Sequence, residues 1–209
     1  ILEIKDLNLF YGGIHALKDI NLTVRNGEII TLIGANGAGK TSTLRAISSL
    51  EKIKSGSINY NGKDIVGVPA NKLVAMGISH VPEGRKIFGN LTVMENLELG
   101  AYLRKDKDEI KKDYEDVFKK FPRLKERLKQ NAGTLSGGEQ QRIAIARSLS
   151  YNPKIIIADE PTGNLDKDIE NDILNIFEHL AKDENKCIII VTHSQNVCDR
   201  ADIVYELKK

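Results

Sequence analysis

The sequence predicts an α/β fold with a mostly parallel sheet, an N-terminal antiparallel β subdomain and an inserted helical subdomain. Three observations lead to this fold class. From Ser136 onward, short apolar runs alternate with helical patterns, which is typical of a parallel sheet covered by helices. Residues 1–33 contain strand-like segments separated by turns. Residues 84–132 change to helical patterns rich in charged side chains.

The composition is that of an ordinary globular protein. The chain has 209 residues, of which 41% are hydrophobic and 29% are charged, and its formal net charge is +2. This length allows one domain with a substantial core. The net charge argues neither for nor against a nucleic-acid partner. No apolar run approaches the roughly 20 residues that a membrane-spanning helix needs, so we expect any contact with a membrane to go through a partner.

The two cysteines and the N-terminus give further context. Cys187 and Cys198 form no C-x-x-C pair and have no His at metal-ligand spacing, so we expect a buried strand thiol and a separate helix thiol in a reducing cytoplasm. The chain begins with Ile1 and shows no signal-peptide layout. Because an initiator Met is missing, we expect the numbering to begin inside a longer polypeptide.

The first part of the chain is expected to form strands and one helix. The expected strands are residues 1–4, 7–10, 20–24 and 29–33, with turns at Gly12 and Gly13 and at Asn26 and Gly27. A helix is expected from Lys40 to about Leu50. Within residues 56–64, the pair Asn61 and Gly62 indicates a hairpin.

The helical subdomain is placed at residues 84–135, inserted into an α/β core formed by residues 1–83 and 136–209 of a single domain. A helical pattern covers residues 91–103, with Thr92 and Glu95 spaced as a capping box. Charges of both signs alternate in residues 104–112, which favours a solvated helix face over a nucleic-acid patch. Residues 111–128 are expected to continue as a helix around Pro122.

The last part of the chain returns to alternating helices and strands. The expected helices are residues 136–150 and 168–182 and a short one before the last strand. The expected strands are residues 154–158, 187–191 and 203–207.

Residues 34–41 match the phosphate-loop motif G-x-x-x-x-G-K-[ST] at every fixed position. Glycines let successive N–H groups point at phosphate oxygens, and the following helix N-terminus favours an anion. A chance glycine-rich turn is the alternative, but the preceding strand and following helix favour the motif. We expect Lys40 to reach the β- and γ-phosphates and Thr41 to bind Mg²⁺. The predicted ATP-binding residues here are Gly34, Ala35, Asn36, Gly37, Ala38, Gly39, Lys40, Thr41 and Ser42.

A buried strand, residues 154–158, leads into two carboxylates, Asp159 and Glu160. Burying a carboxylate is unfavourable unless something pairs with it, and the Mg²⁺ of Mg-ATP is the evident partner beside a phosphate loop. We expect Asp159 to hold the metal, directly or through water, and Glu160 to accept a proton from the attacking water. Seen alone, the pair would be explained as a cap of the next turn.

Residues 135–142 read Leu-Ser-Gly-Gly-Glu-Gln-Gln-Arg, which closely resembles the L-S-G-G-Q signature of ABC ATPases. Position 139 holds Glu where the shortest consensus has Gln, and this form is common in the family. With the phosphate loop upstream and the acidic strand downstream, the chain is identified as a member of this family over essentially its whole length. The resemblance implies the ABC ATPase fold, a P-loop NTPase core, and hydrolysis of ATP to ADP and phosphate.

The resemblance also implies roles for single residues. Tyr11 stands where the family has an aromatic that stacks on adenine, although an ordinary strand-end aromatic is the alternative. His193 corresponds to the switch histidine that contacts the γ-phosphate, and Asp166 to the D-loop that communicates across the dimer. In the family, the signature grips ATP held by another subunit. The residues expected to bind ATP in this way are Ser136, Gly137, Gly138 and Glu139.

One position departs from the family pattern. Glu83 stands where the family has a Gln at the junction with the helical subdomain. An ionised Glu can still touch Mg²⁺ or its water, but it cannot donate a hydrogen bond. We therefore expect the metal site to consist of Thr41, Asp159 and Glu83.

The two parts of the chain resemble different branches of the family. Residues 1–141, including Val-Pro-Glu-Gly-Arg at 81–85, resemble ATPases of branched-chain amino-acid importers. Residues 142–209, with Asp-Glu-Pro-Thr-Gly-Asn-Leu-Asp at 159–166, resemble lipoprotein-releasing and macrolide-export ATPases. Natural drift and an engineered hybrid both explain the change near Gln141, and its abruptness favours the hybrid.

Two functions follow from the resemblance. The first is an ATP-hydrolysing subunit that powers a membrane transporter through ATP-driven head-to-tail dimerisation, with branched-chain amino acids as the cargo. It would form a homodimer or a heterodimer with another ABC ATPase, bind transmembrane permease subunits and no nucleic acid, and lie in the cytoplasm on the inner face of the cell membrane. The alternative is a stand-alone or engineered ATPase domain that binds ATP without a transport partner.

Overall fold

Two β-sheets and a group of helices make up residues 2–208, the part of the chain that the computed structural model describes. The strands are β1 (Leu2–Tyr11), β2 (Ile14–Val24), β3 (Ile29–Ile33), β4 (Ser55–Tyr60), β5 (Lys63–Asp64), β6 (Ile78–Val81), β7 (Ile155–Asp159), β8 (Cys187–Val191) and β9 (Ile203–Glu206). The helices are α1 (Lys40–Ile47), α2 (Ala70–Ala75), α3 (Val93–Gly100), α4 (Lys107–Lys120), α5 (Pro122–Lys125), the 3₁₀ turn η1 (Ala132–Thr134), α6 (Gly137–Leu149), α7 (Lys167–Lys182) and α8 (Gln195–Arg200).

The N-terminal sheet is antiparallel, with strand order β2-β1-β4-β5. Gly12 and Gly13 form the tight turn between β1 and β2, and Asn61 and Gly62 form the turn of the second hairpin, both as the sequence predicts. The two strands expected before residue 11 are one strand, β1, which has an irregularity at Asp6, where φ is +48°. This arrangement confirms an N-terminal antiparallel sheet.

The second sheet is parallel, with strand order β6-β7-β8-β3-β9. Its central strands β7, β8 and β3 are apolar except for the buried Thr31 and the terminal Asp159, because both faces of the sheet are covered. In β7, Ile156 and Ala158 pack into the core on the side of α6 and α7, while Ile155 and Ile157 pack into the core shared with α1 and the antiparallel sheet. The α/β fold with a parallel sheet is therefore confirmed.

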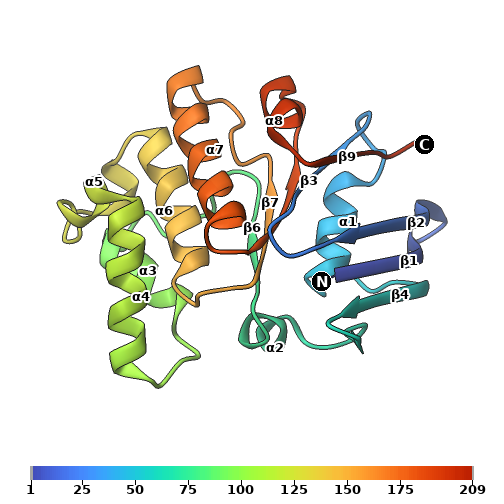
Figure 1. Ribbon diagram of the computed structural model, residues 1–209, viewed down its shortest axis with the longest axis horizontal. Coiled ribbons are helices and arrows are strands. Elements are labelled where there is room, and N and C mark those ends of the chain that lie inside the picture. Colours follow the sequence, from blue (N-terminus) through green and yellow to red (C-terminus); the bar gives the residue numbers. More distant parts are fainter. Residues whose placement is uncertain (1, 209) are drawn as a thin grey trace.

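The elements are arranged in layers (Figure 1). Helices α3, α4 and α5 lie at one end of the molecule, and the antiparallel sheet lies at the other. The parallel sheet lies between them, with α6 and α7 on the side of the helical end and α1 on the side of the antiparallel sheet. No helix within residues 2–208 combines the length and the apolar character needed to cross a membrane.

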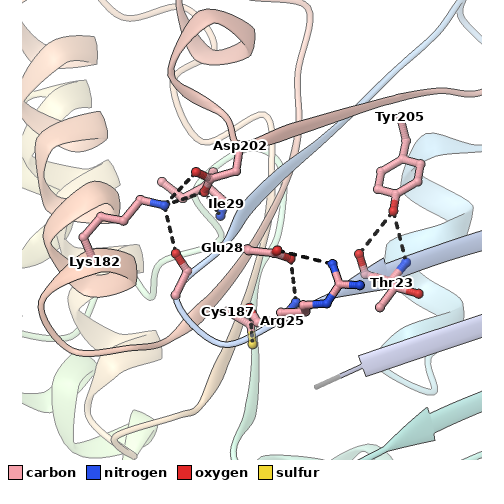
Figure 2. Close-up of polar contacts among 9 residues, drawn as sticks. Thr23, Arg25, Glu28, Ile29, Lys182, Cys187, Asp202 and Tyr205 are labelled. Carbon is pink, nitrogen blue, oxygen red and sulfur yellow. Dashed lines mark hydrogen bonds and ion pairs between the residues drawn. The ribbon is translucent and has the colours of Figure 1, made fainter.

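Polar contacts connect β9 and α7 to the segment that joins the two sheets (Figure 2). Lys182 Nζ lies 2.7 Å from both carboxylate oxygens of Asp202, and it also donates to the carbonyl of Gly27. Asp202 accepts a hydrogen bond of 2.8 Å from the N–H of Ile29. The Tyr205 hydroxyl bonds the backbone of Thr23 on the antiparallel sheet. These contacts fix the start of β3, the strand that leads into the phosphate loop.

One expected helix needs correction, and the structure contains elements that the sequence did not predict. The single helix expected at residues 111–128 is two helices, α4 and α5, separated at Phe121. Pro122 lacks an N–H and disfavours helical backbone at the residue before it, so it begins a new helix instead. Helix α2 and strand β6 were not predicted from the sequence. The cysteines are free, with Cys187 buried in β8 and Cys198 half-buried in α8, as expected.

Candidate functional site

The phosphate loop connects β3 to α1, and its shape depends on two glycines. Gly34 has φ +149°, and a Cβ at this position would lie 2.5 Å from the carbonyl oxygen of Leu207. Gly39 has φ +93°, and a Cβ there would lie 2.4 Å from a methyl group of Leu17 and 2.8 Å from the carbonyl of Ala16. No side chain fits at either position, which explains physically why these two positions of the motif must be glycine.

Lys40 is the first residue of α1, and its side chain folds back into the loop. Its exposed fraction is 7%, and Nζ donates hydrogen bonds to the carbonyls of Gly34 at 2.7 Å and Ala35 at 3.2 Å. The first turn of α1 contains no acidic residue. The ammonium group and the positive end of the helix dipole therefore act together and favour a bound anion.

Two carboxylates lie at the end of β7. Asp159 is 3% exposed and accepts a hydrogen bond from Thr41 Oγ1 at 3.3 Å. Burial raises the pKa of Asp159, and the negative charge of Glu83 raises it further. Burial also raises the pKa of Glu160, against the opposing effect of His193, whose Nε2 lies 3.4 Å from a Glu160 carboxylate oxygen. Removing these carboxylates from water disfavours their charged forms.

The parallel sheet explains why these side chains meet. Glu83, Asp159, His193 and the phosphate loop follow the carboxyl ends of β6, β7, β8 and β3, which are neighbours in that order in the sheet. Ligands of open α/β sheets bind at this edge. Here the edge carries a cavity of about 520 Å³, within the usual range for small-molecule sites. Its lining includes Asn36, Gly37, Gly39, Lys40, Thr41, Ser42, Glu83, Asp159, Glu160, Asn164 and His193.

Tyr11 lies at the border of this site. It ends β1, its side chain is 40% exposed, and its hydroxyl donates to Ser42 Oγ at 3.3 Å. Because Ser42 lines the cavity, the aromatic ring stands beside the first turn of α1. Its exposure leaves ring surface for a flat partner to stack on.

The signature residues lie elsewhere on the chain. Ser136 caps α6 and forms a capping box with Glu139, which was not predicted from the sequence. Glu139 accepts hydrogen bonds from the N–H and hydroxyl of Ser136 at 3.0 and 2.9 Å and pairs with Arg127 at 3.1 Å. Burial alone would raise the pKa of Glu139, but the hydrogen bonds from Ser136 and the charge of Arg127 lower it below its ordinary value. None of the signature residues lines the cavity, so one chain does not bring its two anion-binding motifs together.

The D-loop residue Asp166 likewise has a role within its own chain. It caps α7, and its carboxylate accepts a hydrogen bond of 2.9 Å from the N–H of Ile169. A Cβ added to Gly138 would lie 2.7 Å from a methyl group of Ile169, so the first turns of α6 and α7 are in close contact. Asp166 does not line the cavity, whereas its neighbour Asn164 does.

The donor set at the cavity fits a hard cation that is shared with phosphate groups. Thr41, Asp159 and Glu83 supply oxygen atoms, which Mg²⁺ prefers. Asp159 is a buried carboxylate that accepts a hydrogen bond from the Thr41 hydroxyl. Within residues 2–208, no group of three His, Cys, Asp or Glu side chains could hold a metal ion. Mg²⁺ usually combines one or two protein ligands with substrate phosphates, so this arrangement fits it.

Comparison with known proteins assigns the family. The ABC transporter family model matches residues 17–163. The high-affinity branched-chain amino acid transport ATP-binding protein BraG of Pseudomonas aeruginosa is 41% identical over 208 residues, which cover 100% of this chain and 89% of BraG. The macrolide export ATP-binding/permease protein MacB of Bartonella henselae is 35% identical over 195 residues, which cover 91% of this chain and 29% of MacB.

A solved structure gives the same result. The dimeric post-hydrolysis state of the ATP-binding cassette MJ0796, bound to ADP and Pi, has a TM-score of 0.88 and 29% identity and covers 100% of this chain and 94% of its own. BraG matches both sides of residue 141, so the comparisons do not support an engineered join there. The chain therefore belongs to the ABC transporter family and is one of its ATP-binding, ATP-hydrolysing domains.

Proposed function

We propose that this chain hydrolyses ATP in the cavity between the phosphate loop and the end of β7, and that this hydrolysis powers a membrane transporter. The observation that carries the proposal is the meeting of the loop, Asp159, Glu160 and His193 around one cavity of about 520 Å³. The family membership and the names of the relatives support the transport role.

Each side chain has a proposed part in the reaction. Lys40 and the N–H groups of the loop bind the phosphates, and Tyr11 stacks on the base. Glu160 takes a proton from the water that attacks the γ-phosphate, since its raised pKa makes it a better base than an ordinary carboxylate. His193 contacts the γ-phosphate and orients Glu160. Mg²⁺, held by Thr41 and Asp159 with Glu83 nearby, would neutralise charge on the transferred phosphoryl group.

The proposed site is completed by a second ATPase subunit, with which this chain forms a homodimer or a heterodimer. Gly137 and Gly138 present N–H donors beside the cap residue Ser136 at the N-terminus of a 13-residue helix, away from the cavity of their own chain. In a head-to-tail dimer they would face the γ-phosphate of the ATP bound to the other subunit. The dimeric state of MJ0796 supports this arrangement.

A groove beside the helical subdomain, residues 84–135, is the proposed docking surface for a transmembrane permease. The groove has a volume of about 500 Å³ and lies between α2 and β6 on one side and Phe88, Leu99 and Tyr102 on the other. Leu50, Phe88 and Tyr102 are at least half exposed, which is unusual for large apolar side chains. MacB, whose name joins an ATP-binding protein to a permease, supports a permease as the occupant.

The same relatives support a proposed cargo and location. We assign branched-chain amino acids as the cargo, because BraG is a transport ATP-binding protein for them and matches the whole chain. The chain would then lie in the cytoplasm, on the inner face of the cell membrane, and reach the membrane only through the permease.

The substitution Glu160→Gln tests the catalytic assignment. The parent protein should hydrolyse Mg-ATP, whereas the variant should bind ATP, fail to turn it over and accumulate as a dimer in size-exclusion chromatography with ATP. Lys40→Ala is the matched control at the other side of the cavity and should lose ATP binding in a titration. Hydrolysis by Glu160→Gln at the parental rate would rule out Glu160 as the general base.

A further inference from the structure

Arg85 lies against the N-terminus of α6, although it belongs to the loop that follows β6. A Cβ built on Gly137 would lie 2.7 Å from Arg85 Nη2 and 3.0 Å from both Cζ and Nη1. Such distances mean that the guanidinium group rests directly on the backbone of Gly137. Within residues 2–208, no hydrogen bond or ion pair holds this guanidinium, in contrast to Arg127, which is paired with Glu139.

The first-turn carboxylate of α6, Glu139, is taken up by Ser136 and Arg127, so within residues 2–208 Arg85 has no acidic partner of its own at this positive helix end. A helix N-terminus carries a partial positive charge, so a cation placed there is repelled, and the usual preference is for an acidic side chain. Arg85 adds a full positive charge and a fork of N–H donors to the free N–H groups of the first turn. Donors and positive charge therefore meet at one place, and the complementary ligand is a group with negative charge and several acceptor oxygens, such as a phosphate.

The backbone of the loop holds Arg85 in this position. Gly84, Arg85 and Lys86 have φ values of +76°, +67° and +47°. Positive φ is uncommon for residues other than glycine and persists only where the surroundings impose it. Arg147 of α6 donates a hydrogen bond of 2.9 Å to the carbonyl of Lys86, which attaches the loop to the same helix.

We propose that Arg85 is a further ATP-binding residue, which contacts the γ-phosphate of the ATP held by the phosphate loop of a second copy of this chain. The inference rests on the proposed head-to-tail dimer. In that arrangement Arg85 would act beside Ser136, Gly137 and Gly138, and the phosphate would remove the repulsion at the helix N-terminus. ADP lacks the γ-phosphate, so the contact would favour dimers with ATP over dimers with ADP.

The same loop connects the two kinds of site. Glu83 lines the cavity of its own chain, and Arg85, two residues later, touches the helix that would face the ATP of the other chain. One short segment would therefore contact both nucleotides of the dimer.

The test measures ATP-dependent dimerisation in the Glu160→Gln background by analytical ultracentrifugation. Adding Arg85→Ala should raise the ATP concentration at half-maximal dimerisation by roughly tenfold or more, because a charge-assisted hydrogen bond to phosphate is lost. Arg85→Lys should recover part of the effect, since it keeps the charge and loses the fork. Lys105→Ala removes the same charge from an exposed side chain outside the site and should match the background protein.

Two further readouts separate binding from a structural role. ATP binding to monomeric Arg85→Ala, measured at low protein concentration, should equal that of the parent, because the residue acts on the other chain's nucleotide. The melting temperature without nucleotide should stay the same or rise, because an unfavourable charge has been removed. A large fall in melting temperature with unchanged dimerisation would assign Arg85 to folding and overturn the inference.

Mixing two variants tests whether Arg85 acts on the other chain. Lys40→Ala and Arg85→Ala chains together form dimers in which one site has an intact loop and an intact Arg85, so ATPase activity should reappear above that of either variant alone. Absence of recovery overturns action in trans.

If the Glu160→Gln protein itself fails to dimerise with ATP, the proposed function fails and the inference fails with it. If it dimerises and Arg85→Ala does so equally well, only the inference about Arg85 is wrong.

Discussion

At the scale of single residues, the site is built from groups that destabilise the folded chain. Asp159 is almost completely buried, and within residues 2–208 Thr41 is the one side chain that donates a hydrogen bond to it. Glu160 is held at φ +47°, in the left-handed region, at the sharp turn after β7. Both features cost stability, yet they place a cation ligand and a base beside phosphate. We therefore expect substitutions that relieve them to stabilise the fold and to reduce the activity.

Asp159→Asn should therefore stabilise the protein at neutral pH while abolishing Mg²⁺-dependent hydrolysis. The folded-state pKa of Asp159 lies above its unfolded value, so the stability that its protonated form contributes is lost as pH rises through that pKa. Removing the charge should raise the free energy of unfolding at pH 7, and with it the melting temperature. The difference should shrink as the pH falls below the unfolded pKa of about 3.9, where the carboxyl becomes protonated in both states.

The matched control for this substitution is Asp116→Asn on α4. The carboxylate of Asp116 forms an exposed ion pair with Lys119, and such pairs contribute little, so the melting temperature should change by less than it does for Asp159→Asn. If Asp159→Asn lowers the melting temperature at neutral pH without nucleotide, burial of the Asp159 charge is not the dominant effect.

At the scale of elements, two helices begin with the same device. Thr92 and Glu95 form a capping box at the start of α3, and Ser136 and Glu139 form one at the start of α6. Each box satisfies backbone N–H groups that a helix start leaves without partners. Only the box of α6 is proposed to face a nucleotide, so the pair allows the structural and binding roles of a cap to be separated.

Thr92→Ala and Ser136→Ala should each lower the free energy of unfolding by about 1 kcal/mol, because each removes an N-cap side chain. Thermal unfolding without nucleotide measures this common loss. In the Glu160→Gln background, only Ser136→Ala should also weaken ATP-dependent dimerisation, since only its hydroxyl would reach the γ-phosphate. Equal dimerisation by the two variants would show that the N-terminus of α6 does not face the nucleotide.

At the scale of the whole molecule, function depends on how the helical end and the core meet. The cavity proposed to bind ATP lies at the carboxyl edge of the parallel sheet, while the apolar groove lies where α2 and β6 meet residues 88–102. The segment of residues 83–88 connects them, because Glu83 lines the cavity and Phe88 lines the groove. A permease in the groove would thus contact the same loop that approaches the nucleotide.

The double substitution Leu50→Asp and Tyr102→Asp should prevent docking of the permease. Both side chains are more than half exposed, so the isolated chain should fold and hydrolyse ATP as before. Co-purification with the permease subunits of a branched-chain amino-acid transporter should be lost, because two charges would be buried against an apolar partner. Val204→Asp, at an exposed apolar position on β9, is the control and should keep the permease. Retained co-purification of the double variant would exclude the groove as the docking surface.

The sequence by itself determined the local features of this protein. Residues 34–41 fix the phosphate loop because its glycines and the following helix start act within one strand–loop–helix unit. Apolar runs identified β7 and β8, and turn pairs such as Asn61 and Gly62 identified the hairpins. The signature also identified the family, since its residue types and order are specific.

Only the tertiary structure decided what depends on contacts between distant segments. Strand β6 was not predicted because it is short and contains two polar residues, Ser79 and His80, so its sequence does not look like a buried strand. Its burial results from packing beside other strands. The contact of Arg85 with Gly137 and the closeness of Glu83 to Asp159 follow from the strand order β6-β7-β8-β3, which packing of the whole chain sets. Local sequence carries loop and helix-start preferences, but side chains from separate strands meet only once the sheet has formed.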